Sequence, residues 1–186
     1  MNKSLMDTIF AIDAKWSERL RLKRKNQIIW PAAVFFAHSG DSWFCLLVLS
    51  LIWLFGNMQW HNHAALMGVA TVAMAIIVLS IKFLVRRQRP AGDWGAIYRK
   101  SDPHSFPSGH AARTALLAVM AVGLGPVWFG WLLLIWAPAV SLARVITGLH
   151  YLSDVLVGIL VGVAGGLLFL HFAPQIMTLF PFAFLS

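Results

Sequence analysis

Five stretches of the chain carry almost only apolar side chains and are separated by more polar segments. They cover residues 42–55, 64–84, 110–124, 127–143 and 152–172. Because the hydrocarbon core of a bilayer is about 30 Å thick, a helix needs about 20 apolar residues to cross it. The pattern therefore predicts an all-α fold, an integral membrane helical bundle of about five transmembrane helices.

The N-terminal region has a different pattern. Apolar residues recur every three or four positions, with cations between them, at Leu5, Ile9, Ile12, Trp16 and Leu20. This spacing predicts an amphipathic helix lying in the headgroup plane. The next apolar segment, 28–37, is too short to span a bilayer and is interrupted by Pro31, so we interpret it as interfacial or re-entrant. Residues 1–38 thus precede a transmembrane core at 42–172, and all 186 residues are predicted to form a single membrane-embedded domain.

The composition supports a membrane protein, since 59% of the residues are hydrophobic and only 12% are charged. The net charge of +8 could indicate a nucleic-acid partner, but the cations lie between apolar segments and form no basic-aromatic module, so we expect no nucleic acid. The single cysteine, Cys45, lies in an apolar run. This chain alone therefore builds neither a disulfide framework nor a thiolate metal site.

All fifteen Lys and Arg residues fall on one side of a five-span arrangement. They lie in the N-terminal region, around the connection between the second and third apolar stretches, and at Arg144. The opposite connections and the C-terminal tail contain no Lys or Arg. The positive-inside rule therefore predicts that the cation-rich side faces the cytoplasm.

Charged groups near bilayer depth cost at least about 2.5 kcal/mol each and therefore indicate function. The first polar cluster contains Lys82, Arg86 and Arg89, which would share one helical face before Pro90 ends the helix. The alternative is that these long side chains only anchor a helix end at the interface.

The second cluster begins a new helix. Ser108 and Gly109 offer a hydroxyl, a closely approachable backbone and unpaired N–H groups at the positive end of a helix dipole, which favours anion binding. The alternative is an ordinary Ser N-cap, with His110 as an incidental residue of the first turn.

In the third cluster, His150 and Asp154 are four residues apart, so the carboxylate can hold the imidazole in one tautomer; Arg144 lies just upstream. The alternative is a structural His–Asp helix cap. Taken together, the cations and the helix start predict a phosphate pocket. The two histidines then supply a nucleophile and an acid, with the Asp-paired His150 as the better nucleophile and an unpaired His110 as the better proton donor.

These residues resemble the type 2 phosphatidic acid phosphatase (PAP2) family, which is related to vanadium haloperoxidases. The family's pattern of Lys-x6-Arg-Pro, Pro-Ser-Gly-His and Ser-Arg-x5-His-x3-Asp is matched from Lys82 to Asp154. The resemblance implies a metal-independent lipid phosphatase that needs no cofactor. In it, His150 attacks phosphorus, Asp154 orients His150, and His110 protonates the leaving alcohol. The residues implied to hold the phosphate are Lys82, Arg89, Ser108, Gly109 and Arg144.

Two features depart from the family pattern. Ala143 stands where the family usually has Ser, with Ser141 close by. Many bacterial members resemble six-span proteins whose site faces away from the cytoplasm, whereas this chain predicts five spans. We expect an integral protein of a bacterial inner (plasma) membrane with its site on the cytoplasmic side. Asp102 and His104 precede the second motif and could contact a headgroup, but a His and an Asp in a loop are more often solvated, so we expect these two to be solvated.

The predicted function is hydrolysis of a phosphomonoester or diphosphate headgroup through a phosphohistidine intermediate. Phosphatidylglycerol phosphate, phosphatidic acid and polyprenyl diphosphate are the candidate substrates, and membrane lipids are the expected surroundings. Alternatives are a lipid phosphotransferase with the same site and a non-catalytic anion transporter. A metal hydrolase using His104, His110, His150 and Asp154 is disfavoured, because a metal ion would compete with the cations for the same anion.

Overall fold

The computed structural model describes residues 3–22, 28–92, 94–179 and 181–185, and within them it is built from helices without strands. The α-helices are α1 (Lys3–Leu20), α2 (Ile29–Ser39), α3 (Ser42–Phe55), α4 (Met58–Val85), α5 (Ala96–Ser101), α6 (Gly109–Leu124), α7 (Val127–Ile146), α8 (Leu152–His171) and α9 (Ala173–Leu179). A 3-10 turn, Pro181–Ala183, follows α9. The predicted all-α class is confirmed.

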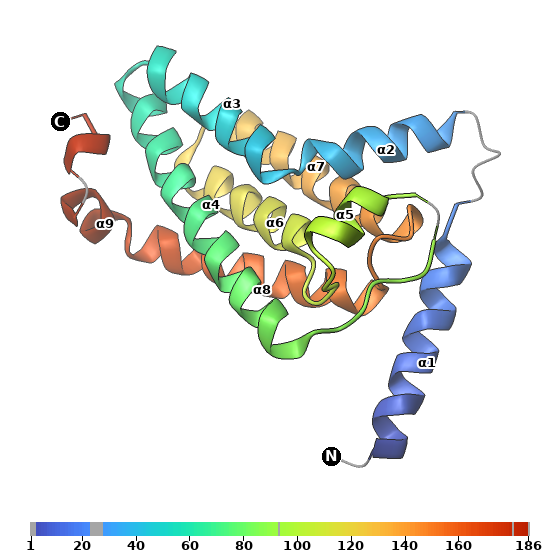
Figure 1. The fold of residues 1–186 in the computed structure, drawn as a ribbon. Helices are drawn as coiled ribbons and strands as arrows, with labels where there is room; N and C mark the ends of the chain where they lie inside the picture. The colour runs from blue at the N-terminus through green and yellow to red at the C-terminus, as the bar shows by residue number, and fades with distance from the viewer. Residues whose placement is uncertain (1–2, 23–27, 93, 180, 186) are drawn as a thin grey trace.

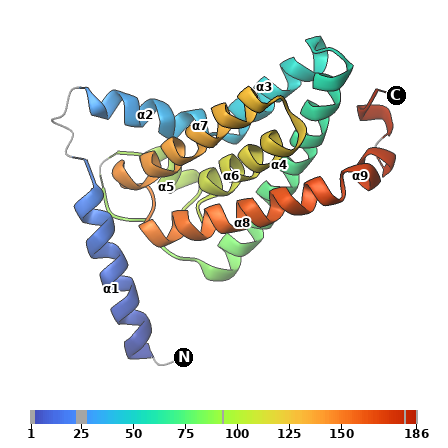
Figure 2. The same cartoon turned by 180° about the vertical axis from the view of Figure 1, so that it is seen from behind.

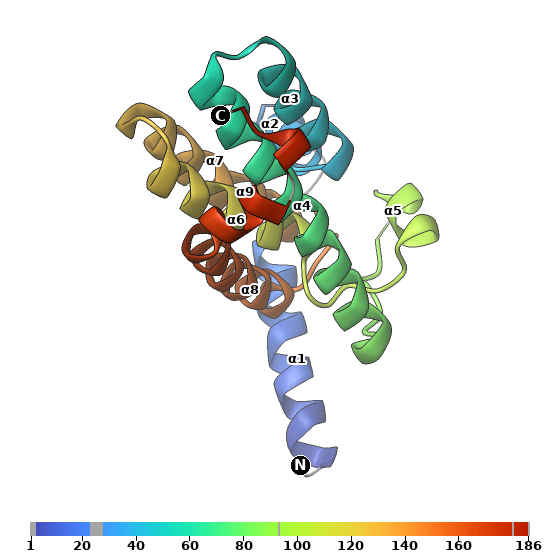
Figure 3. The same cartoon turned by 90° about the vertical axis from the view of Figure 1, so that its left-hand side faces the viewer.

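Five helices, α3, α4, α6, α7 and α8, form the bundle (Figure 1). Helix α1 projects from one end of this bundle, and α5 with its flanking loops lies at the same end (Figure 2). Helix α9 and the C-terminus lie at the other end (Figure 3). The described segments that carry cations therefore gather at the end of the bundle near α1 and α5 (Figure 1).

Three of the described helices, α4, α7 and α8, are long and apolar enough to cross a bilayer. Helices α2 and α3 pass the same test only as a pair, which is bent by 64° at its break, and α6 has 16 residues. The five apolar stretches thus correspond to five helices, while the number of complete crossings stays a prediction. Pro31 does not interrupt α2, because it lies in the first turn, where its missing N–H costs no helical hydrogen bond.

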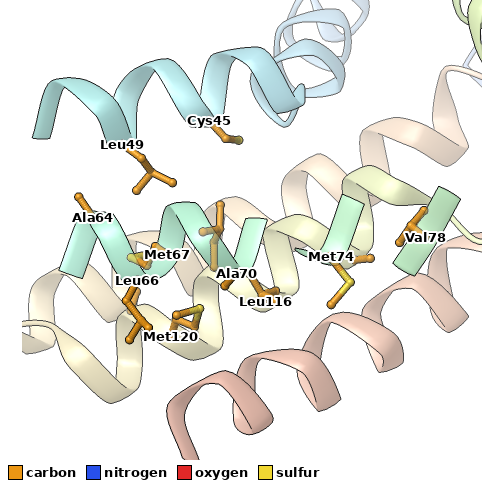
Figure 4. Close-up of a cluster of buried hydrophobic side chains, with 13 residues drawn as sticks. Cys45, Leu49, Ala64, Leu66, Met67, Ala70, Met74, Val78, Leu116 and Met120 are labelled. Atoms are coloured by element: carbon orange, nitrogen blue, oxygen red, sulfur yellow. The ribbon is translucent and has the colours of Figure 1, made fainter. Parts of the chain in front are cut away.

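The core is centred on α6, whose residues 111–118 are all buried. On one side, side chains of α3, α4 and α6 interlock, including Leu49, Met67, Met74 and Leu116 (Figure 4). On the other side, α8 packs against α6 through glycines. A Cβ at Gly162 would lie 2.1 Å from the carbonyl oxygen of Ala112. The two backbones therefore approach closely, as small residues permit between membrane helices, and this contact holds the first turn of α6 against the middle of α8.

Candidate active site

The first polar cluster lies where α4 ends. The helix stops at Val85, and Arg86 caps it in a left-handed conformation with a φ of 52°. Arg89 is therefore reached by a non-helical segment, and the prediction that Lys82, Arg86 and Arg89 share one helical face is wrong. Arg86 is exposed and donates to the carbonyl of Phe83. Lys82 and Arg89 are 4% and 9% exposed.

Lys82 and Arg89 nevertheless meet at the carboxylate of Asp102. Lys82 Nζ lies 2.5 Å and Arg89 Nη2 lies 2.7 Å from Asp102 Oδ2. The same loop contributes carbonyl acceptors, because Lys82 donates to His104 at 2.9 Å and Arg89 Nε donates to Asp102 at 2.7 Å. Asp102 was expected to be solvated. In the structure it instead forms ion pairs with two cations of the predicted phosphate site.

Arg89 also connects this cluster to His150. Its Nη1 lies 2.9 Å from His150 Nε2 and 3.0 Å from the carbonyl oxygen of Leu149. Because a guanidinium only donates, Nε2 is the acceptor and carries a lone pair. Burial, followed by the charges of Arg89, Arg144 and Lys82, holds the pKa of His150 well below its usual value of 6.5. The imidazole is therefore neutral at pH 7, as a nucleophile must be.

Asp154 lies on the other side of the His150 ring. Its Oδ2 is 3.6 Å from His150 Nδ1, which is within ion-pair range but longer than a hydrogen bond. The same oxygen accepts from the backbone N–H of Tyr151 at 2.9 Å, and Oδ1 accepts from Arg87 at 2.7 Å. Asp154 therefore combines the two interpretations of the sequence, because it lies beside the histidine and also caps α8.

The second cluster begins α6 as predicted, with Ser108 as the N-cap residue and Gly109 as the first helical residue. The Ser108 hydroxyl accepts from the N–H of Ala111, and the Ser108 N–H donates to the carbonyl of Asp154 at 2.9 Å. Ser108 is therefore an N-cap, as in the alternative interpretation of the sequence. The backbone N–H of Ser108 also connects the second cluster to the third.

His110 has a partner that the sequence analysis missed. Its Nε2 lies 2.6 Å from Oδ1 of Asp41, which occupies the break between α2 and α3. Asp41 also accepts from the hydroxyl of Tyr98 at 3.0 Å. The prediction of an unpaired His110 is therefore wrong. One signal was available, because Asp41 is the only acidic residue between Glu18 and Asp93 and lies between apolar segments.

Arg144 is completely buried near the end of α7. Its Nη1 donates to the carbonyl of Ala37 at 2.9 Å, and its guanidinium lies 4.6 Å from the centre of the Tyr98 ring. Its Nε and Nη2 have no hydrogen-bond partner in the described part of the chain. Donors buried in this way are suited to an anionic ligand. The neighbouring Ala143 is 2% exposed, so a serine hydroxyl is replaced by a buried methyl group.

One cavity of about 450 Å³ connects the clusters. Its polar wall includes His110, His150, Lys82 and Asp102. Its apolar wall comes from α3 and α4. The lining residues are Asp41, Ser42, Trp43, Met74, Ala75, Val78, Leu79, Lys82, Tyr98, Asp102, Gly109, His110, Arg113 and His150. The cavity can therefore hold a phosphate beside His150 and an apolar chain along Met74, Val78 and Leu79.

Comparison with known proteins decides the family, because a sequence model of the PAP2 superfamily matches residues 63–177. The chain belongs to the PAP2 superfamily. It is 39% identical over 137 residues to a decaprenylphosphoryl-5-phosphoribose phosphatase of Mycobacterium tuberculosis, covering 70% of this chain and 72% of the relative. It is 30% identical over 154 residues to an undecaprenyl-diphosphatase of Bacillus subtilis, covering 82% and 79%.

The fold is also shared with solved PAP2-type proteins. A phosphatidylglycerolphosphate phosphatase from Bacillus subtilis superposes with a TM-score of 0.72 at 23% identity, covering 91% of this chain and 88% of the other. Aquifex aeolicus LpxE superposes with a TM-score of 0.68 at 21% identity, covering 84% and 93%. The predictions of an integral membrane protein and of a PAP2-type lipid phosphatase are confirmed. The roles of the individual site residues stay predictions.

Proposed function

We propose that this PAP2-type phosphatase removes a terminal phosphate from a lipid headgroup by way of a phosphohistidine at His150. The observation that carries the proposal is the 2.9 Å contact between Arg89 and His150 Nε2, with Lys82 and His110 in the same cavity. A neutral imidazole nitrogen next to buried cations suits nucleophilic attack on a phosphoryl group whose negative charge must be neutralised.

In the first step, Arg89 Nη1 leaves His150 Nε2 for a phosphoryl oxygen, the freed lone pair of Nε2 forms a bond to phosphorus, and the bond between phosphorus and the ester oxygen breaks. His110, held by Asp41, gives its proton to the departing alkoxide, so the lipid leaves as an alcohol. Water then attacks the phosphohistidine, His110 takes a proton from this water, and the P–N bond breaks. Inorganic phosphate leaves, and both histidines return to their starting states. Lys82, Arg89, Arg144 and the start of α6 at Ser108 and Gly109 stabilise the phosphoryl oxygens in this scheme.

The cavity supports a lipid phosphomonoester as the substrate. Its apolar wall on α3 and α4 includes Trp43, Met74, Val78 and Leu79, which suits a hydrocarbon chain. A relative of this chain is a phosphatase for decaprenylphosphoryl-5-phosphoribose, which places a polyprenyl-linked sugar phosphate first among the substrates to test. Undecaprenyl diphosphate, phosphatidylglycerol phosphate and phosphatidic acid complete the panel.

Phosphate release from this panel, measured with purified protein in detergent, tests the activity. His150→Gln should abolish release, whereas the exposed His171→Gln at the far end of α8 should retain it. With a 32P-labelled substrate, rapid quenching should trap label that is stable in alkali and labile in acid, as expected for phosphohistidine. Full activity in His150→Gln would refute the proposed nucleophile. An added lipid alcohol that captures the label would identify the phosphotransferase alternative.

The location that we propose is a bacterial inner membrane, with the site on the cytoplasmic side. It is supported by the gathering of all Lys and Arg residues toward one side of the expected spans. In a Cys45→Ala background, Lys100→Cys marks an exposed position on α5 beside the site, and Gln59→Cys marks the opposite end of the bundle. An impermeant thiol reagent on intact cells should label only Gln59→Cys. Labelling of Lys100→Cys from outside would reverse the orientation.

A further inference from the structure

Helix α1 contacts the bundle through a polar face. Of its described side chains, only Asp13 and Ser17 are shielded, and they lie one turn apart on one face. The apolar side chains Ile12 and Trp16 are each 52% exposed. Helix α1 therefore leaves these two hydrophobic side chains exposed, and its shielded side chains attach it to the bundle by hydrogen bonds.

Those hydrogen bonds cap the start of α8. Ser17 Oγ accepts from the backbone N–H of Leu152 at 2.9 Å, and Asp13 Oδ1 accepts from the N–H of Ser153 at 3.1 Å. The Ser153 hydroxyl donates to Asp13 Oδ2 at 2.5 Å. Leu152 and Ser153 are the first two residues of α8, so their N–H groups have no partner within the helix. A separate helix thus completes the cap of α8, to which Asp154 also contributes.

Asp13 also reaches Asp154 through Arg87. Arg87 Nη2 lies 2.7 Å from Asp13 Oδ2, and Arg87 Nη1 lies 2.7 Å from Asp154 Oδ1. The guanidinium is held over the Tyr151 ring at 4.0 Å. The side chains of Asp13 and Arg87 are 10% and 12% exposed, and Asp154 is fully buried. These charges are poorly screened, so each constrains the position of the next.

We propose that Asp13 is a positioning residue for the phosphatase reaction, acting through Arg87 and the cap of α8 on Asp154 and hence on His150. This inference rests on the proposed nucleophilic role of His150. It assigns to α1 a part in catalysis in addition to contact with the membrane surface. Asp13 does not line the cavity, so it affects the alignment of the nucleophile and leaves substrate binding unchanged.

Asp13→Asn tests the inference, because it removes the charge and keeps a side chain of the same size. Since small misplacements of reacting groups cost up to about 100-fold in rate, kcat should fall about 10- to 100-fold while KM stays within about threefold. Asp13→Glu should recover part of kcat. The matched control is Glu18→Gln on the same helix, whose carboxylate is 71% exposed and pairs only with Arg21 among the described residues. This control should retain full activity.

A double-mutant cycle with Arg87→Gln separates positioning from general destabilisation. If Asp13 acts through Arg87, the loss in the double variant is much smaller than the product of the two single losses. Additive losses, or a kcat for Asp13→Asn equal to that of the wild type, would overturn the inference. If His150→Gln is inactive while Asp13→Asn is fully active, only the role of Asp13 fails. A wild-type protein that releases no phosphate from any lipid would instead refute the proposed function.

Discussion

Asp102 occupies the position between Lys82 and Arg89 at which a substrate phosphate is expected. Both cations contact the same carboxylate oxygen, at 2.5 and 2.7 Å. An incoming phosphate must therefore displace this carboxylate or share the cations with it. Asp102→Asn removes the competing charge and keeps the shape of the side chain. The variant should bind inorganic phosphate, the product of the reaction, more tightly than the wild type.

The size of the effect follows from the two contacts. A hydrogen bond to a charged partner contributes about 1.5–3 kcal/mol. The Asp102 side chain is 39% exposed, and solvent screening reduces its contribution toward the lower end of that range. A loss of about 1.4 kcal/mol of competition corresponds to a tenfold change in an equilibrium constant. We therefore expect the inhibition constant of inorganic phosphate to fall about tenfold.

Competitive inhibition of lipid hydrolysis by inorganic phosphate measures this constant. Asp102→Glu, which keeps the charge, is the control and should stay within about threefold of the wild type. The difference between Asp102→Asn and wild type should shrink as salt is added, because the competing charge is partly exposed. Unchanged or weaker phosphate inhibition in Asp102→Asn would refute the reasoning and would indicate that Asp102 instead orients the cations.

Three further predictions concern His110, His150 and the helix contact. Asp41→Asn should lower kcat for a lipid substrate about 10- to 100-fold but change hydrolysis of an activated aryl phosphate less than threefold, because a good leaving group needs little protonation; equal losses would contradict this role. The pKa of His150 is lowered in the folded state, so its contribution to stability is complete above about pH 6.5 and is lost on acidification. The melting temperature of the wild type should therefore fall as the pH drops below about 6.5, and this fall should be smaller in His150→Gln. Gly162→Ala should lower the unfolding free energy by about 1–3 kcal/mol through overpacking against Ala112, whereas Gly68→Ala, which meets no atom within 4 Å, should melt like the wild type.

Hydropathy located the core helices well, because a membrane helix must be apolar along most of its length. The largest error is at the start of α4, which begins at Met58 rather than near residue 64. Its first turn contains His61 and is capped by Asn57, whose side chain accepts from the N–H of Trp60. Polar residues at the end of a helix are compatible with the headgroup region. A hydropathy pattern therefore underestimates the length of a helix that extends beyond the hydrocarbon core.

The site was less predictable than the helices. Residue spacing predicted that α6 begins at Gly109 and that His150 lies beside Asp154, because both depend on contacts within a few residues. The path of the chain after α4 was missed, since a left-handed cap at Arg86 leaves no periodic signal. The position of Asp41 depends on the break between α2 and α3, which brings distant segments together. Such contacts arise from packing and cannot be obtained from spacing.

The contacts that the sequence analysis missed at His110, Arg89 and Arg87 all involve a carboxylate outside the family's motifs. The chain has seven acidic residues. Among those that the structure describes, Asp41 and Asp102 contact predicted site residues directly. Asp13 pairs with Arg87, which also pairs with Asp154. Buried cations and histidines need anionic partners, since an isolated buried charge is costly. Asp102 meets this need for Lys82 and Arg89. In an apolar chain with many cations, each rare acidic residue is therefore a candidate partner of the site, even where no motif includes it.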